Sequence, residues 1–373
     1  MADYRIVSYR PSYRSQIAEL QNNLWGRNTE LNAAYFDWKY LRNPYVKDPL
    51  VYLALYQEQV VGMRGLVGAE WEFGSPRQRQ VLPLAADMVI APNHRNRGLV
   101  TLLMKAALED LAEKHYTYVV SMEARPATLL SQITTGWRQV GSLEPMERSV
   151  APSRSFPGVR ALLKKSPFVV RAYRSVRPRQ IQKANRDAAG LFGSPKDQTL
   201  TRHVVMETLP RPEEMAELGD RLGPDARIRH VRDATYYAWR FQNPRSRYRF
   251  LFWRQRRMEG YLVLQAESSE AWESVRVIDW QASSDRVLAE LFDSTVKMVR
   301  GRTLCIWSAT MKENERRILE AAGFQRLNQA TNPKAVTVRP VSDEVLSQEW
   351  VLGSQRLLTM ANWDFRMIHS RAY

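Results

Sequence analysis

Apolar positions in the first 147 residues follow two different spacings, and these predict an alternation of strands and helices. Runs rich in β-branched and aromatic residues indicate strands. Helical spacing after Pro11 (Ile17, Leu20, Leu24) and over 98–114 indicates amphipathic helices. The predicted order is strand 4–9, helices from 11 and over 28–41, strands 51–56, 60–73 and 81–91, helix 98–114, strand 116–122, helix 126–135 and a strand after Trp137. This order predicts an α/β or α+β fold with helices on both faces of one sheet.

The second half of the chain repeats this plan. Residues 35–40 (YFDWKY) with Asn-Pro at 43–44 match residues 236–241 (YYAWRF) with Asn-Pro at 243–244. Each match is followed by an aromatic hairpin, by a strand containing an aspartate (Asp87 or Asp279), and by a closing Gly-aromatic step. Several features in one order indicate a duplication. We therefore predict two domains, 1–147 and 196–373, joined by a segment over 148–195.

Composition narrows the class of protein. A chain of 373 residues with 44% hydrophobic and 25% charged residues fits two globular domains. The single cysteine, Cys305, leaves no partner for an intrachain disulfide, and the scattered histidines lack metal-ligand spacing, so no metal site is expected. The N-terminal residues do not resemble a secretion signal, and no run of about 20 apolar residues indicates a membrane span. We expect a cytoplasmic protein, or one peripheral to the inner face of a membrane.

The net charge of +16 is concentrated between the two copies. Residues 151–186 contain ten lysines and arginines, no acidic residue, and apolar residues between the charges. Three interpretations stay open: a solvated loop, a segment that contacts an anionic membrane, or one that binds nucleic acid such as tRNA.

The stretch from Asp87 to Leu103 carries the clearest chemistry. It reads as a strand, a turn rich in hydrogen-bond donors, and a helix that begins at Gly98. The first amides of a helix lack intrahelical acceptors and lie at the positive end of its dipole, so they favour an anion. Gly98 allows close backbone approach, and Arg95 and Arg97 add cationic donors. This pattern suits a diphosphate.

The motif V-x-x-P-x-x-R-x-x-G-L resembles motif A of the GNAT acyltransferase superfamily. The resemblance implies two tandem GNAT folds and acetyl-CoA, or another acyl-CoA, as the donor. Val100 stands where the family has a small residue, and the second copy has no matching glycine around Asp285. The cofactor-binding residues that it implies are Val89, Ile90, Arg95, Asn96, Arg97, Gly98, Leu99 and Val100.

The resemblance also implies the catalytic groups. GNAT enzymes often take the general base from the fourth strand, which makes Asp87 the first candidate and Glu123, at the end of the fifth strand, the second. Gln132 stands where the family usually has a tyrosine that acts as the general acid, with Ser131 beside it. Water, Ser131, Tyr116 or Tyr118 are the alternative proton donors for the leaving thiolate.

These features predict an acyl-CoA-dependent N-acyltransferase, with acetyl transfer to an amine of a sugar, an amino acid, a peptide or a lipid-linked acceptor. One alternative is a Fem-like aminoacyl-tRNA-dependent transferase that acts on a cell-envelope precursor. The other is a non-catalytic tandem GNAT adaptor. The sequence does not identify the acceptor amine, the acyl chain or the general acid.

Overall fold

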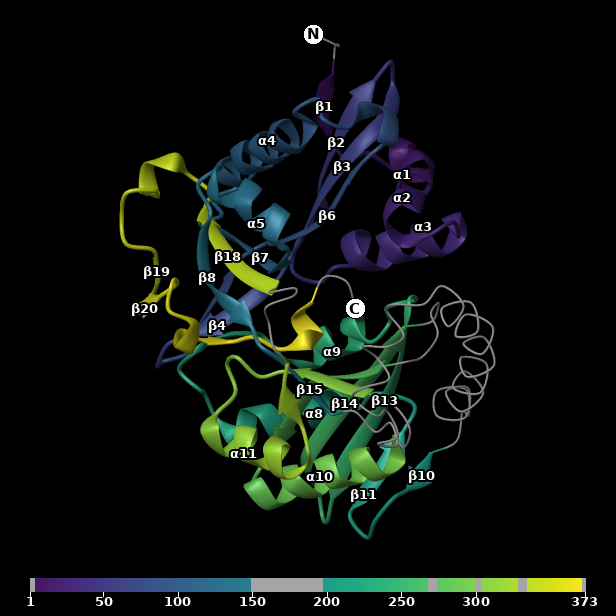
Figure 1. The fold of residues 1–373 in the computed structure, drawn as a ribbon, viewed down its shortest axis with the longest axis vertical. Coiled ribbons are helices and arrows are strands. Elements are labelled where there is room, and N and C mark those ends of the chain that lie inside the picture. Colours follow the sequence, from purple (N-terminus) through teal and green to yellow (C-terminus); the bar gives the residue numbers. More distant parts are fainter. Residues whose placement is uncertain (1–3, 149–196, 268–273, 300–302, 328–333, 371–373) are drawn as a thin grey trace, which may run out of the picture.

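Two large mixed sheets, each flanked by helices, dominate the structure (Figure 1). It is a computed structural model that describes residues 4–148, 197–267, 274–299, 303–327 and 334–370. The strand order is β1-β2-β3-β6-β7-β18-β8 in the seven-stranded sheet and β10-β11-β13-β14-β15-β16-β9-β17 in the eight-stranded sheet. The mixed α/β class predicted from the apolar spacing is confirmed.

The N-terminal copy follows the predicted order with one addition. The run at 60–73 is broken at Gly68 into two strands, and residues 78–81 form a further strand, so an extra hairpin (β4–β5) precedes β6. The elements are β1 (Arg5–Ser8), η1 (Pro11–Tyr13), α1 (Arg14–Leu20), α2 (Asn22–Trp25), α3 (Thr29–Phe36), η2 (Asp37–Leu41), β2 (Leu50–Tyr56), β3 (Gln59–Val67), β4 (Glu70–Phe73), β5 (Gln78–Val81), β6 (Leu84–Ile90), η3 (Pro92–His94), α4 (Leu99–Glu113), β7 (Tyr118–Ala124), α5 (Pro126–Ile133) and β8 (Arg138–Leu143).

The two faces of this sheet are covered by different helices. Helix α4 buries Leu103, Ala107 and Leu111, which recur every fourth residue, against one face of β2, β3 and β6. Helices α1 and α3 bury Ile17 and Phe36 against the opposite face. The part of the sheet from which β6 leads into α4 is therefore packed on both faces.

The second copy has the same plan. The elements between Pro145 and Pro340 are β9 (Pro145–Arg148), β10 (Gln198–Thr199), β11 (Val204–Glu207), α8 (Pro212–Leu222), β12 (Ile228–His230), α9 (Ala234–Arg240), β13 (Ser246–Arg254), β14 (Met258–Glu267), β15 (Ser274–Ala282), α10 (Asp285–Met298), β16 (Thr303–Trp307), α11 (Glu313–Ala321), β17 (Gln325–Arg326) and β18 (Lys334–Pro340).

The two sheets exchange one strand each. Strand β18, from the second half of the chain, lies between β7 and β8 of the first sheet, and β9, from the first half, lies between β16 and β17 of the second. The predicted boundaries at 147 and 196 stay predictions, but neither large sheet is built from one continuous stretch of sequence. Folding of each sheet consequently depends on the other half of the chain.

Contacts between equivalent residues confirm the predicted repeat. Trp38 and Trp239 stack with ring centroids 5.1 Å apart, and the indole N–H of each donates to the carbonyl oxygen of the other, at 2.8 and 2.9 Å. Gly136 and Gly323 have φ angles of +86° and +87°. A Cβ added at either glycine would meet an arginine of the exchanged strand, Arg339 or Arg148. The copies are therefore related by an approximate twofold axis near the tryptophan pair.

The C-terminal residues, which the sequence does not place on the repeat, tie the halves together. They form η5 (Asp343–Val345), β19 (Val351–Leu352), β20 (Gln355–Arg356), η6 (Met360–Asn362), β21 (Trp363–Asp364) and η7 (Met367–His369). Strand β21 joins β12 of the second copy and the β4–β5 hairpin of the first in one small sheet.

Candidate donor site

The loop between β6 and α4 has the conformation expected of an anion-binding turn. Residues 91–98 connect the strand to the helix, and both Asn96 (φ +58°) and Gly98 (φ +74°) have left-handed backbones. Gly98 is the N-cap of α4, and no side chain caps the helix. Helical geometry leaves the amides of Leu99 and Val100 without an intrahelical acceptor. A Cβ added at Gly98 would meet no atom within 4 Å, so the space above the loop is open to a ligand.

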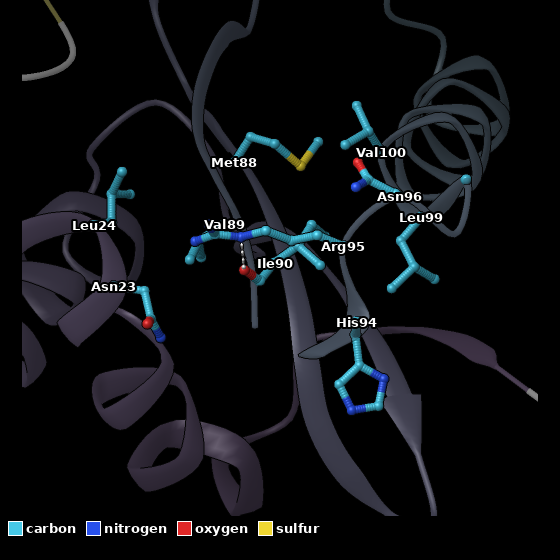
Figure 2. A pocket seen from close by; sticks show the side chains of 11 residues that line it. Asn23, Leu24, Met88, Val89, Ile90, His94, Arg95, Asn96, Leu99 and Val100 are labelled. Atoms are coloured by element: carbon cyan, nitrogen blue, oxygen red, sulfur yellow. Dashed lines mark hydrogen bonds between the residues drawn. The ribbon is translucent and has the colours of Figure 1, made fainter. Parts of the chain in front are cut away.

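A cavity of about 520 Å³ lies on this loop (Figure 2). Seven of the eight residues predicted to bind the donor line it, from Val89 and Ile90 on β6 to Val100 on α4. The exception is Arg97, whose guanidinium donates to the hydroxyl of Tyr4 at 3.2 Å. The remaining lining residues, Asn23, Leu24, Met88 and His94, were not predicted as site residues.

Their positions explain why the sequence did not identify these four. Helical spacing groups Leu24 with the core residues Ile17 and Leu20, yet the structure leaves it 38% exposed. Asn23 precedes it on α2, which reaches the cavity only through tertiary packing. Met88 directly precedes the motif and His94 lies at one of its variable positions, so the motif is the signal that could have identified them.

The side chain of Arg95 lies along the end of β6. Its Nε donates to the carbonyl oxygen of Ile90 at 3.3 Å (Figure 2). The residue is exposed, and its guanidinium is therefore free to turn toward a phosphate by rotation about side-chain bonds.

Strands β6 and β7 separate beside the cavity. Over their described lengths they are joined in parallel register through one pair, Leu84 with Val120. Strand β6 then continues to Ile90 without β7 beside it. Parted strands leave backbone amide and carbonyl groups of β6 available to a bound molecule.

Asp87 does not line the cavity. Its side chain is 1% exposed, and its carboxylate oxygens accept hydrogen bonds from Lys39 Nζ at 2.9 Å and from the Tyr40 hydroxyl at 3.0 Å. The pKa of Tyr40 is raised well above its usual value, first by burial and next by the charge of Asp87, so the phenol keeps its proton and donates. Lys39 reaches this position from the π-helical turn η2, in which Arg42 N donates to Asp37 O at 2.9 Å. The role of general base for Asp87 stays a prediction.

The other candidate catalytic residues are placed as follows. Glu123 lies on β7, and its side chain is outside what the structure describes. Gln132 is buried, donating to Ser121 at 2.9 Å and accepting from Thr337 of β18 at 3.0 Å. It therefore links the exchanged strand to β7 and does not replace the expected acid.

The three alternative acids lie apart from the cavity lining. Ser131 is exposed on α5, Tyr116 is half-buried, and Tyr118 packs near Trp350 with ring centroids 6.5 Å apart. None of the three lines the donor cavity.

The second copy has no comparable loop. Only Ser283 and Ser284 separate β15 from α10, and the hydroxyl of Ser284 caps the helix by accepting from Val287 N. Asp285 adds a negative charge in the first turn. One amide at the start of this helix is thus satisfied by the protein itself, and the prediction that this loop binds no CoA stays a prediction.

The aspartate of the second copy is buried like Asp87. Asp279 is 0% exposed and pairs with Arg232 at 3.0 Å and with Arg366 at 3.3 Å. Arg232 and Arg366 also pair with Asp364, and although burial opposes it, their charges hold the pKa of Asp364 well below its usual range. The repeated aspartate therefore makes a buried ion pair in both copies, including the one without a donor loop.

Comparison with known proteins supports the fold. Residues 5–129 match a family model described as an acetyltransferase (GNAT) domain. A tandem GNAT protein from the clavulanic acid biosynthesis pathway is 11% identical, with a TM-score of 0.51 over 91% of this chain and 99% of that chain. The chain is a tandem GNAT-fold protein.

Two further solved structures share the fold. A GCN5-related N-acetyltransferase from Anabaena variabilis has a TM-score of 0.58 at 14% identity, over 91% of this chain and 73% of that one. A protein from Enterococcus faecalis described as a probable N-acyltransferase has a TM-score of 0.59 at 10% identity, with the same coverage. No curated protein matches the sequence. At these identities the structures show the fold alone.

Three other expectations concern the basic segment, a membrane span and a metal site. The basic segment 151–186 lies outside the described residues, so its contact with lipid or tRNA stays a prediction. Among the described residues no helix is long and apolar enough to span a membrane. No group of three His, Cys, Asp or Glu side chains in the same ranges could hold a metal ion.

Proposed function

We propose that this tandem GNAT-fold protein is an N-acyltransferase that uses an acyl-CoA donor and binds it once, in the N-terminal copy. The observation that carries the proposal is the coincidence of the cavity with the loop 91–98 and the uncapped start of α4. The matched helix α10 starts with its own cap and an acidic residue, which makes the second copy an internal control.

The residues present fit the diphosphate of CoA. The amides of Leu99 and Val100 and the positive end of α4 would hold the phosphate oxygens, and Arg95 would add a charge-assisted bond. The open space at Gly98 leaves room for them. The edge of β6 that β7 leaves free would accept the pantetheine amides.

The thioester supplies an activated acyl carbon. An amine nitrogen forms the new C–N bond as the C–S bond breaks, and the thiolate leaves with the electron pair. The amine loses one proton and the thiolate gains one, so a base and an acid, or water in either role, complete the reaction. We retain Asp87 and Glu123 as proposed bases. Asp87 is the one to test first, because its contacts are described and the side chain of Glu123 is not.

Titration calorimetry with CoA tests the proposal. We expect binding to the native chain, and loss of binding in Gly98→Glu, because the new carboxylate would lie where the phosphates approach. Gly98→Ala is the matched control: it has the same backbone strain at φ +74° but no charge, and should weaken binding far less. A folded native chain without CoA affinity would contradict the proposal, and salt-sensitive tRNA binding in its place would favour the Fem-like alternative.

Turnover is the second half of the test. Release of free thiol from acetyl-CoA, followed with a panel of primary amines on sugars, amino acids and peptides, should exceed the rate without amine. Binding of CoA without turnover for any acceptor would favour the non-catalytic adaptor.

A further inference from the structure

The wall of the donor cavity opposite the start of α4 belongs to a very short helix. Asn23 and Leu24 line the cavity from α2, which has four residues, and Figure 2 shows them across the cavity from Asn96 and Val100. No side chain caps the N-terminus of α2, and Gly26 ends the helix with a φ angle of +105°. Because a single helical turn has little stability of its own, contacts with other elements must hold this wall in place.

The second copy supplies a contact at the C-terminal end of α2. The guanidinium of Arg245 donates to the carbonyl oxygen of Trp25 at 2.6 Å and to Asn32 Oδ1 at 3.0 Å, and its central carbon lies 5.5 Å from the centroid of the Trp25 ring. Asn32, which is 0% exposed, in turn donates to the carbonyl oxygen of Gly26 at 3.0 Å and to Asn22 Oδ1 at 2.9 Å. The last carbonyl groups of a helix have no partner inside it, so a cationic donor at this end stabilises the turn.

The equivalent position of the first copy makes a different contact. Tyr45 and Arg245 each follow an Asn-Pro pair, and in both turns their backbone N–H donates to the side chain of that asparagine, at 2.9 and 3.0 Å. Tyr45 also reaches the other copy, since its ring centroid lies 5.8 Å from that of His230. Its hydroxyl, however, is buried and has no hydrogen-bond partner among the described residues. The position directed at the donor copy therefore makes hydrogen bonds that its counterpart does not.

We propose that Arg245 is a positioning residue for the donor site, and that through it the second copy holds α2 where donor binding requires it. This inference rests on the proposed function. Arg245 does not line the donor cavity, so its effect on the donor passes through Asn23 and Leu24. When its hydrogen bonds are lost, α2 occupies the binding-competent position in only a fraction of the molecules, and the apparent affinity falls in proportion to that fraction.

Titration calorimetry of Arg245→Ala with CoA tests the inference. Because a hydrogen bond to a charged group shifts an equilibrium by about tenfold or more, we expect the dissociation constant of CoA to rise about tenfold. Arg245→Lys keeps the charge but lacks the planar fork that reaches two acceptors, so the rise should be smaller, about threefold. An unchanged dissociation constant in Arg245→Ala, or in Arg245→Lys if the alanine variant does not fold, would overturn the inference and leave the proposed function in place. Absence of CoA binding by the native chain would refute both.

Tyr45→Ala is the matched control, because Tyr45 occupies the equivalent turn and contacts His230 and Tyr236 of the second copy. Urea unfolding would measure the stability of each variant beside its affinity for CoA. A positioning role predicts weaker CoA binding in Arg245→Ala and native affinity in Tyr45→Ala, even where Tyr45→Ala is the less stable protein. Equal losses of affinity in the two variants would show that Arg245 acts only through the general stability of the contact between the copies, and would overturn the inference.

Discussion

Replacing Asp87 by asparagine should destabilise the protein by about 3–5 kcal/mol. The variant removes the negative charge but keeps an oxygen that can accept from Tyr40. It leaves the ammonium of Lys39, whose side chain is 2% exposed, without the carboxylate that lies 2.9 Å away. A buried charge that loses its partner costs several kcal/mol, which accounts for the expected size.

The partner variant separates a structural role from a catalytic one. Lys39→Met removes the positive charge at similar side-chain volume, and the double variant of Lys39→Met with Asp87→Asn removes both charges. Because replacing both members of a buried ion pair is often close to neutral, we expect the double variant to regain most of the lost stability. The coupling free energy should be at least about 2 kcal/mol.

Urea unfolding of all four proteins would measure this coupling, with CoA affinity as the check that the donor site is intact. Additive single effects would refute the reasoning that the two charges stabilise each other. Turnover gives an independent answer on catalysis: acyl transfer by a double variant that is stable and binds CoA would exclude Asp87 as the base, whereas its loss would show that the Lys39–Asp87 pair is needed for the reaction.

Three further predictions follow from the structure. Burial lowers the pKa of His230 to about 3, so between pH 6.5 and 3 the unfolded chain binds a proton that the folded chain does not. The free energy of unfolding should therefore fall on acidification through that range, by up to about 1.4 kcal/mol per pH unit. His230→Asn should lessen this slope in urea unfolding between pH 5 and 7, and an unchanged slope would contradict the prediction. Val338→Asp on strand β18 places a charge at a fully buried position and should lower the free energy of unfolding by several kcal/mol. Because β18 pairs with β7 and β8, amide hydrogen exchange should become faster in these two strands and CoA binding should weaken. An effect confined to the second sheet would contradict the placement of β18 in the first. Arg245 of the second copy donates a hydrogen bond to the carbonyl oxygen of Trp25, on α2, at 2.6 Å. Arg245→Ala should therefore speed amide hydrogen exchange over residues 22–26. Unchanged exchange there would show that this hydrogen bond does not stabilise α2.

Much of the fold could be predicted from the sequence, because residues close together in the chain decide where a helix forms and which turn precedes it. Helix α4 has apolar residues at helical spacing, and the turn before it contains the glycine that its positive φ requires. The aromatic residues of the repeat predicted the duplication, and Trp38 and Trp239 meet at its axis. Seven of the eight predicted donor residues line one cavity for the same reason: the motif encodes the loop locally.

Features that depend on distant pairing could not be predicted in this way. Strands β9 and β18 have ordinary strand patterns, and nothing in a short stretch says which sheet a strand will join. The partners of Asp87 lie on a turn nearly fifty positions earlier in the chain, so the sequence indicated a carboxylate on the strand but not its burial. The exposure of Leu24 likewise follows from the place of α2 beside the loop.

The number of CoA molecules bound per chain tests the central claim most directly. Calorimetry of the native protein with CoA should give one site, and Gly98→Glu should abolish it. The matched change in the second copy, Ser284→Glu at the N-cap of α10, should leave both the affinity and the single site unchanged, because no donor is expected to bind at the start of that helix. Absence of binding, two sites per chain, or equal loss in the two variants would contradict a single donor site at the start of α4.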